Sequence, residues 1–167
     1  MAKRRYEMDE AKIARFEKEG RGRGSGADYL PWLTIQDVPS RGRRARVFTP
    51  LTGREHHLFS DIETSVFFLL HWNAAVVDLR EQFPLDRAET RRIAAEIGVP
   101  HPTDRQTGVD IVMTLDLLVD ARDAAGTSCI PVSSKPFDDL GDRRTLEKLE
   151  IERRYCQERW GGWRLMT

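Results

Sequence analysis

The clearest pattern of hydrophobic positions is helical and lies at residues 60–75 (SDIETSVFFLLHWNAA). At its start, Ser60 stands three residues before Glu63, which is the S-x-x-E spacing of a capping box and marks the first turn of a helix. Apolar positions then recur every three or four residues and predict one wide buried face. That face contains Ile62, Val66, Phe67, Leu69 and Leu70.

Weaker helical patterns, rich in charged residues, predict further helices elsewhere in the chain. They lie at residues 8–19, 89–97 and 143–159. Gly20 and Gly98 follow the first two stretches and are expected to end these helices, because glycine readily adopts the backbone conformation found after a helix C-terminus.

Stretches rich in β-branched and aromatic residues, bounded by proline and glycine, predict the strands. They lie at residues 76–83, 111–119, 128–134 and 163–167, with shorter extended segments in YLPWLTIQDVP and ARVFTPLTGREHHLF. The second and third of these strands flank the turn DARDAAG, which predicts a hairpin-like pair. Strands with helices around them indicate the α/β class, with a mixed sheet flanked by helices.

At 167 residues, of which 40% are hydrophobic and 32% charged, the chain predicts one folded core with a short appendage. We expect residues 1–25 to form an N-terminal arm, a helix followed by the flexible basic link GRGRGSG, and residues 26–167 to form the main domain. No stretch approaches the roughly 18 apolar residues of a membrane span, and the first residues lack the apolar middle of a secretion signal. We therefore expect a cytoplasmic protein in which Cys129 and Cys156, which lack CxxC spacing, are buried reduced thiols.

The formal net charge is +0, so a case for nucleic-acid binding depends on where the positive charge lies. Arginines gather in two places, which are Arg21 with Arg23 and the group Arg41, Arg43, Arg44 and Arg46. Such a cluster is either a solvated face or a set of phosphate contacts, and the pattern alone does not separate the two. The balanced charge argues against tight non-specific DNA binding by this domain alone, because that affinity comes mainly from phosphate neutralisation.

Residues suited to catalysis stand on the two hairpin strands. Asp116 lies between Leu115 and Leu117, and a carboxylate buried in an apolar strand requires a partner. Lys135, which ends the next strand just before Pro136, is placed to be that partner. Two interpretations stay open: a strand-end ion pair with the lysine reaching water, or two members of an active site.

Glu63 would complete a metal-dependent hydrolytic site. Phosphodiester hydrolysis requires a metal that stabilises developing charge and a positioned water. Magnesium accepts one or two carboxylates together with waters and substrate phosphate, so Glu63, Asp116 and Lys135 suffice if the first turn of the helix packs over the hairpin. The alternative is that Glu63 only caps its own helix, which the S-x-x-E spacing explains equally well.

The order of these residues, an acid on an early helix, an aspartate on a strand and x-x-K ending the next strand, resembles the PD-(D/E)xK nucleases. More specifically, the chain from about residue 12 to residue 167 resembles the TnsA endonuclease subunits of heteromeric bacterial DNA transposases. The resemblance is carried by EGRGRGSGADYLPWLTIQDVPSRGR, TGREHHLFSDIE, VVDLREQFPL, TLDLLVD and RTLEKLEIERRY. It implies a restriction-endonuclease-like fold, with residues 26–167 as the nuclease domain.

The same resemblance implies that Glu63, Asp116 and Lys135 are catalytic. It also implies that Mg²⁺, or Mn²⁺ in its place, is bound by Glu63 and Asp116 together with the segment at Ser133 and Ser134. The position two before the lysine commonly carries an acidic or amide ligand in this family, and here it is Ser133. We expect this hydroxyl either to act through water, with the Ser134 carbonyl helping, or to reduce the metal affinity.

The implied role is cleavage of the 5′ ends of a transposon, while a partner transposase cuts and joins the 3′ ends under an ATP-dependent regulator protein. Members of the family usually continue into a C-terminal domain that contacts the regulator, and we expect that domain to be absent from this sequence. Weaker candidates for contact with the DNA of the transposon ends are Arg41, Arg43, Arg44, His56 and His57. Of the adjacent histidines, one is expected to be packed and one solvated.

Two other functions stay open. One is a non-catalytic DNA-binding or assembly subunit on the same fold, because fold does not guarantee chemistry and Ser133 weakens the ligand set. The other is an unrelated restriction or repair nuclease with the same kind of metal site.

Overall fold

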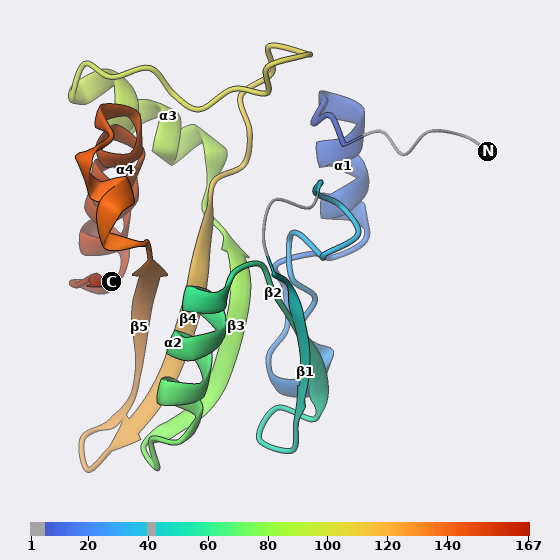
Figure 1. Ribbon diagram of the computed structural model, residues 1–167, viewed down its shortest axis with the longest axis vertical. Coiled ribbons are helices and arrows are strands. Elements are labelled where there is room, and N and C mark those ends of the chain that lie inside the picture. The colour runs from blue at the N-terminus through green and yellow to red at the C-terminus, as the bar shows by residue number, and fades with distance from the viewer. Residues whose placement is uncertain (1–5, 40–42) are drawn as a thin grey trace.

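A four-stranded mixed sheet forms the centre of the molecule in the computed structural model, which describes residues 6–39 and 43–167. The strands lie in the order β3 (Val76–Pro84), β4 (Thr114–Asp123), β5 (Gly126–Ser134) and β6 (Arg164–Met166). The pairs β3–β4 and β4–β5 are antiparallel, whereas β6 is parallel to β5. The predicted mixed sheet flanked by helices is confirmed (Figure 1).

Helices flank this sheet, and each has an acceptor side chain at its N-cap. They are α1 (Glu10–Lys18), α2 (Asp61–His71), α3 (Arg87–Glu96) and α4 (Arg143–Trp160), with short 3₁₀ turns η1 (Gly26–Asp28) and η2 (Phe137–Gly141). The caps are Asp9, Ser60, Asp86 and Asp142. The helix predicted to begin at Glu89 begins two residues earlier, because Asp86 accepts the N–H of Glu89 and thereby closes the first turn.

A separate two-stranded hairpin, β1 (Ala45–Thr49) and β2 (Arg54–Leu58), leads directly into α2. The extended segments predicted in ARVFTPLTGREHHLF are these two strands. The preceding stretch YLPWLTIQDVP forms no strand where it is described. Its backbone is held instead by single contacts, such as the Trp32 N–H donating to the Gln82 carbonyl at 3.1 Å, and its prolines cannot donate to a ladder.

The β4–β5 hairpin is longer than its sequence pattern predicted. Its turn contains only the residues between Asp123 and Gly126, and the Asp123 carboxylate accepts the N–H of Gly126 at 3.1 Å. At the other end β4 starts at Thr114, three residues later than predicted, because Ile111 and Val112 pack beside α1.

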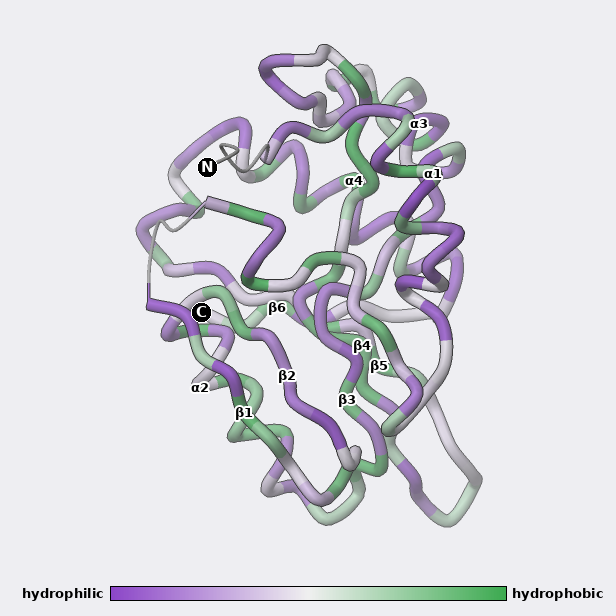
Figure 2. The backbone as a smooth tube through the Cα atoms, turned by 90° about the vertical axis from the view of Figure 1, so that its right-hand side faces the viewer, coloured by the Kyte–Doolittle hydropathy of each residue, from purple (hydrophilic) through white to green (hydrophobic). Residues whose placement is uncertain are grey.

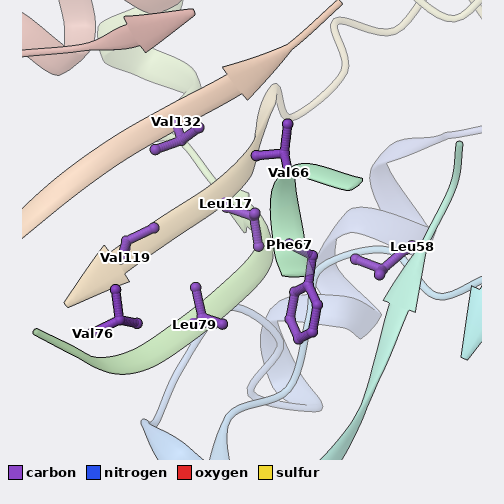
Figure 3. Close-up of a cluster of buried hydrophobic side chains, with 8 residues drawn as sticks. All are labelled: Leu58, Val66, Phe67, Val76, Leu79, Leu117, Val119 and Val132. Carbon is purple, nitrogen blue, oxygen red and sulfur yellow. The ribbon is translucent and has the colours of Figure 1, made fainter. Parts of the chain in front are cut away.

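Hydrophobic clusters cover both faces of the sheet. On one face, side chains of α2 and β2 pack on β3, β4 and β5 (Figure 3). This cluster consists of Leu58, Val66, Phe67, Val76, Leu79, Leu117, Val119 and Val132. On the other face α3 and α4 bury Ile93, Ile151 and Cys156 against Leu115 and Leu118. In Figure 2 hydrophobic stretches follow β4 and β5, and hydrophilic stretches dominate α1 and α3.

The buried face of α2 is narrower than predicted. Val66 and Phe67 are buried, but Leu69 is 63% exposed, and its neighbours Phe68 and Trp72 are 42% and 82% exposed. The expectation that Leu69 belongs to the buried face is wrong, because α2 packs on the sheet along only one side of a run that is apolar nearly all round.

The N-terminal arm packs against the rest of the chain through α1. Ile13 and Phe16 of α1 form a small cluster with Trp32, against which Ile111 and Val112 also pack. Within the described ranges, no helix is long and apolar enough to cross a membrane.

Candidate active site

Asp116 and Lys135 meet where β4 and β5 run side by side. The Asp116 carboxylate accepts hydrogen bonds from the Ser134 N–H at 2.7 Å and the Ser134 hydroxyl at 3.1 Å. The ammonium of Lys135 lies 3.4 Å from the same carboxylate oxygen and donates to the Ser134 carbonyl at 2.9 Å. The hairpin therefore brings these two groups together, as the strand spacing predicted.

The lysine is held among acidic groups. Burial lowers the pKa of Lys135, but the charges of Asp116, Glu152 and Glu63 outweigh burial, so the pKa is raised. The side chain stays charged at neutral pH, and it offers a fixed ammonium to a developing negative charge.

Glu63 caps its own helix and also interacts electrostatically with Asp116 and Lys135. The Ser60 hydroxyl accepts the N–H of Glu63 at 3.2 Å, and the Glu63 carboxylate accepts the N–H of Phe59 at 2.9 Å, so the predicted cap at this helix start is present. Burial and the charge of Asp116 raise the pKa of Glu63 to about 7, and the charge of Lys135 acts in the opposite direction. The side chain therefore caps its helix and lies within electrostatic reach of both hairpin residues.

Glu152 on α4 is a member of the site that the sequence patterns did not single out. It is buried, and its carboxylate accepts hydrogen bonds from the Ser133 hydroxyl and from the Trp163 indole N–H, the latter at 2.9 Å. Burial and the charge of Asp116 raise the pKa of Glu152 to about 7. The sequence did contain a signal that Glu152 is buried, because it stands between Leu149 and Cys156 at the i, i+3, i+7 spacing of a buried helix face.

The two serines before Lys135 have different partners. Ser133 is buried and donates to Glu152, while Ser134 contacts Asp116 through its N–H and hydroxyl. The Ser133 hydroxyl is thus tied to a carboxylate on α4 and does not stand free beside Asp116.

A pocket of about 270 Å³ opens at this site between β4 with the segment before it, the residue that follows β5, and α4. Its lining includes Asp116, Lys135 and Glu152, and Glu63 is not part of it. Among residues 6–39 and 43–167, no group of three His, Cys, Asp or Glu side chains is arranged to hold a metal ion. A metal here would depend on two carboxylates supplemented by backbone oxygen and water.

Of the two histidines before α2, one is packed and one is partly exposed, as expected. His56 is fully buried, with Nδ1 2.8 Å from Glu81 and Nε2 2.7 Å from the Thr52 hydroxyl. This burial leaves His56 no surface for a DNA phosphate, which corrects that part of the expectation. His57 is half-buried, and its Nδ1 accepts the N–H of Ile35 at 3.4 Å.

The arginines near β1 differ in how they are engaged. Arg43 is 87% exposed and lies 3.9 Å from Asp61, whereas Arg44 donates to the carbonyls of Ile35 and Val38 at 2.5 and 2.7 Å. Arg46 lies 3.7 Å from Glu55. Arg41 falls outside the described residues.

In the N-terminal arm, Arg21 is held by its neighbours. Its guanidinium lies 2.7 Å from Asp37 and 2.8 Å from Glu19, and it donates to the Trp32 carbonyl at 3.0 Å. Arg23 is exposed.

Comparison with known proteins adds two findings. Residues 73–167 match the family described as TnsA-like endonuclease N terminal, a range that contains Asp116, Lys135 and Glu152. The whole chain is 50% identical over 167 residues to the Transposon Tn7 transposition protein TnsA of Escherichia coli. The chain spans 60% of the length of that relative.

Proposed function

The chain belongs to the TnsA-like endonuclease family, and on this premise we propose that it is the DNA endonuclease subunit of a transposase. The reaction is hydrolysis of a phosphodiester at the 5′ ends of a transposon during excision. The observation that carries the proposal is the meeting of Asp116 and Lys135 at 3.4 Å, with Glu63 close enough for the charge of Asp116 to raise its pKa.

The donor set fits a hard divalent cation. Glu63 and Asp116 repel each other while both are charged, and a bound cation relieves such repulsion. Magnesium commonly takes one or two carboxylates and keeps several waters, and manganese accepts the same oxygen ligands. We propose that Glu63 and Asp116 hold Mg²⁺, with the Ser134 carbonyl helping. The Ser133 hydroxyl, which donates its proton to Glu152, would act only by accepting from a metal-bound water. When bound, the cation stabilises charge on the phosphate and lowers the pKa of a water.

The protein's own groups would position the reactants. Lys135, with its ammonium held between Asp116 and the Ser134 carbonyl, would orient the attacking water or stabilise the negative charge that develops on the phosphate. Asp116 is fixed by two hydrogen bonds from Ser134, so it holds one orientation towards the pocket. Glu152 on α4 accepts the hydrogen bond of the Ser133 hydroxyl and so fixes the end of β5, directly before Lys135.

We propose that cleavage takes place in an assembly. The name of the relative refers to transposition, and this supports the role of a subunit that acts with a 3′-cutting transposase and an ATP-dependent regulator. The formal net charge of +0 supports the same view, because a neutral domain gains little affinity from phosphate neutralisation alone.

Strand-specific mapping of nicks tests the proposal. A supercoiled plasmid carrying transposon ends would be incubated with the chain, the partner transposase and the regulator, in Mg²⁺ or Mn²⁺. We expect 5′-strand cuts at the ends with the wild type and with Asp61→Ala, an exposed control on α2, and none with Asp116→Ala. Cuts at a short recognition site or at damaged bases would point instead to a restriction or repair nuclease.

One observation favours a second function, that of a non-catalytic assembly subunit. The Ser133 hydroxyl is committed to Glu152, so the position two before Lys135 supplies no free ligand oxygen beside Asp116. Normal 3′ joining without any 5′ cut, in the presence of either metal, would favour this alternative.

A further inference from the structure

One face of α4 lines the pocket of the candidate active site. Its residues Thr145, Lys148, Leu149 and Glu152 recur at the three- and four-residue spacing of a single helix side. Glu152 is buried at the inner end of this row, and Lys148, one turn closer to the helix N-terminus, is exposed. The two side chains are separated by about 6 Å along the helix axis.

Lys148 differs from four other cationic side chains of α4. Arg143 and Arg144 each pair with Glu147, and Arg153 and Arg154 each pair with Glu150, at 2.7 to 2.9 Å. Within the part of the chain that the structure describes, Lys148 has no salt bridge, although Glu152 stands four residues away on the same face. Its charge is therefore available to a ligand in the pocket.

Other positive charges surround Lys148. Arg144 donates to the Pro100 carbonyl at 2.7 Å and so ties the loop that carries Arg105 to the start of α4. Partial burial lowers the pKa of Lys148, the charges of Arg144, Arg105 and Lys135 lower it further, and the charge of Asp142 acts in the opposite direction. Lys148 thus lies within electrostatic reach of three other cations, of which Arg144 and Lys135 have acidic partners, and a polyanion would relieve the repulsion that remains.

We propose that Lys148 binds a backbone phosphate of the DNA next to the phosphate being hydrolysed, with Arg105 adding positive charge beside it. This inference rests on the proposed nuclease function and assigns the substrate-binding side of the site. Lys148 lines the pocket from an exposed position one helical turn from the buried Glu152, and it makes no ion pair with the acidic residues there among the described residues. A phosphate contact of this kind positions the strand and reads no base sequence.

Binding of DNA without cleavage tests the proposal. A fluorescent duplex carrying a transposon end would be titrated with the chain at low ionic strength and without divalent cations, by anisotropy. We expect Lys148→Ala to weaken binding about fivefold or more, and to reduce the slope of log affinity against log salt by about one. Lys148→Arg should restore most of the affinity, since a phosphate accepts either cation. Arg105→Ala should weaken binding to a smaller extent.

The matched control is Arg122→Ala at the far end of β4. Arg122 is exposed, and eight residue steps of strand, or about 27 Å, separate positions 114 and 122. Both substitutions remove one positive charge, so equal weakening by the two would show a general field effect and overturn the proposal. Failure of the wild type to bind, or unchanged binding by Lys148→Ala, would also overturn it. Thermal melting of each variant confirms that it folds.

The binding titration and the cleavage assay together separate this inference from the proposed function. If the wild type binds DNA through Lys148 but never cuts the 5′ strand with metal and partners present, the nuclease proposal fails and the binding site stands. If cleavage occurs at the wild-type rate in Lys148→Ala and binding is unchanged, the binding site fails and the nuclease proposal stands.

Discussion

The carboxylate of Glu63 accepts the backbone N–H of Phe59 at 2.9 Å, so a proposed catalytic acid also closes the turn between β2 and α2. Because the N–H needs only an acceptor oxygen, whereas a divalent cation binds a charged carboxylate more strongly than a neutral amide, the two roles of Glu63 can be separated by one isosteric substitution.

The substitution Glu63→Gln should keep the cap at the start of α2 but lose metal binding and DNA cleavage. The amide oxygen can still accept from Phe59, so we expect the free energy of unfolding to change by less than about 1 kcal/mol. Metal binding should weaken, and 5′-strand cleavage should fall by on the order of 10²-fold or more. Thermal melting, metal titration and nick mapping measure the three effects, with Glu55→Gln, an exposed residue of β2, as control. Unimpaired cleavage by a stable Glu63→Gln protein would mean that Glu63 only caps its helix.

Asp116→Ala and Lys135→Ala should differ in metal binding. We expect Asp116→Ala to lose both metal binding and cleavage, because the proposed site has only two carboxylate ligands. Lys135→Ala should lose most cleavage yet retain metal binding, since an ammonium is not a ligand. Melting temperatures with and without Mg²⁺ report binding, because a ligand of the folded state stabilises it. The assignment would be wrong if Asp116→Ala folded normally and still cut 5′ strands.

Ionisation of Glu81 should make the free energy of unfolding decrease as the pH is lowered. Burial raises the pKa of Glu81, but hydrogen bonds from His56 and Arg54 outweigh it and lower the pKa to about 2. At pH values between about 2 and the unfolded pKa near 4.5, the unfolded state binds more protons than the folded state. The free energy of unfolding that Glu81 contributes is therefore fully present above pH 4.5 and is lost as the pH falls towards 2. The full contribution is roughly 3 kcal/mol.

Glu81→Gln removes this titration, so the free energy of unfolding of the variant should be lower at pH 7 but should change less between pH 5 and pH 3. Urea unfolding at each pH measures this, and Glu55→Gln on the neighbouring strand β2 is again the control. An equally steep acid dependence in Glu81→Gln would show that other carboxyls dominate.

The arginines before and within β1 should separate into structural and DNA-binding residues. Arg44 donates to two backbone carbonyls, so Arg44→Ala should lower the free energy of unfolding by about 2 kcal/mol. Arg43 is 87% exposed, so Arg43→Ala should leave stability unchanged and weaken DNA binding slightly, without sequence bias. Melting and anisotropy titrations distinguish the two. Destabilisation by Arg43→Ala equal to that by Arg44→Ala would contradict this assignment.

The sequence by itself determined the local features of this protein. The Ser60 and Glu63 spacing predicted the start of α2, and the turn between two apolar stretches predicted the β4–β5 hairpin. The juxtaposition of Asp116 with Lys135 followed from that hairpin, because both strands and the turn between them are contiguous in the chain. Capping, side-chain alternation and turn chemistry act over a few residues, so a linear pattern contains them.

The tertiary structure decided what depends on packing between distant segments. Glu152 joined the site because α4 packs on β5, and His56 was removed from solvent because β2 packs beside Glu81 of β3. Leu69 became exposed because only one side of α2 meets the sheet. Each outcome depends on which face of an element meets which neighbour, and a helical or strand period specifies the faces of an element without specifying their partners.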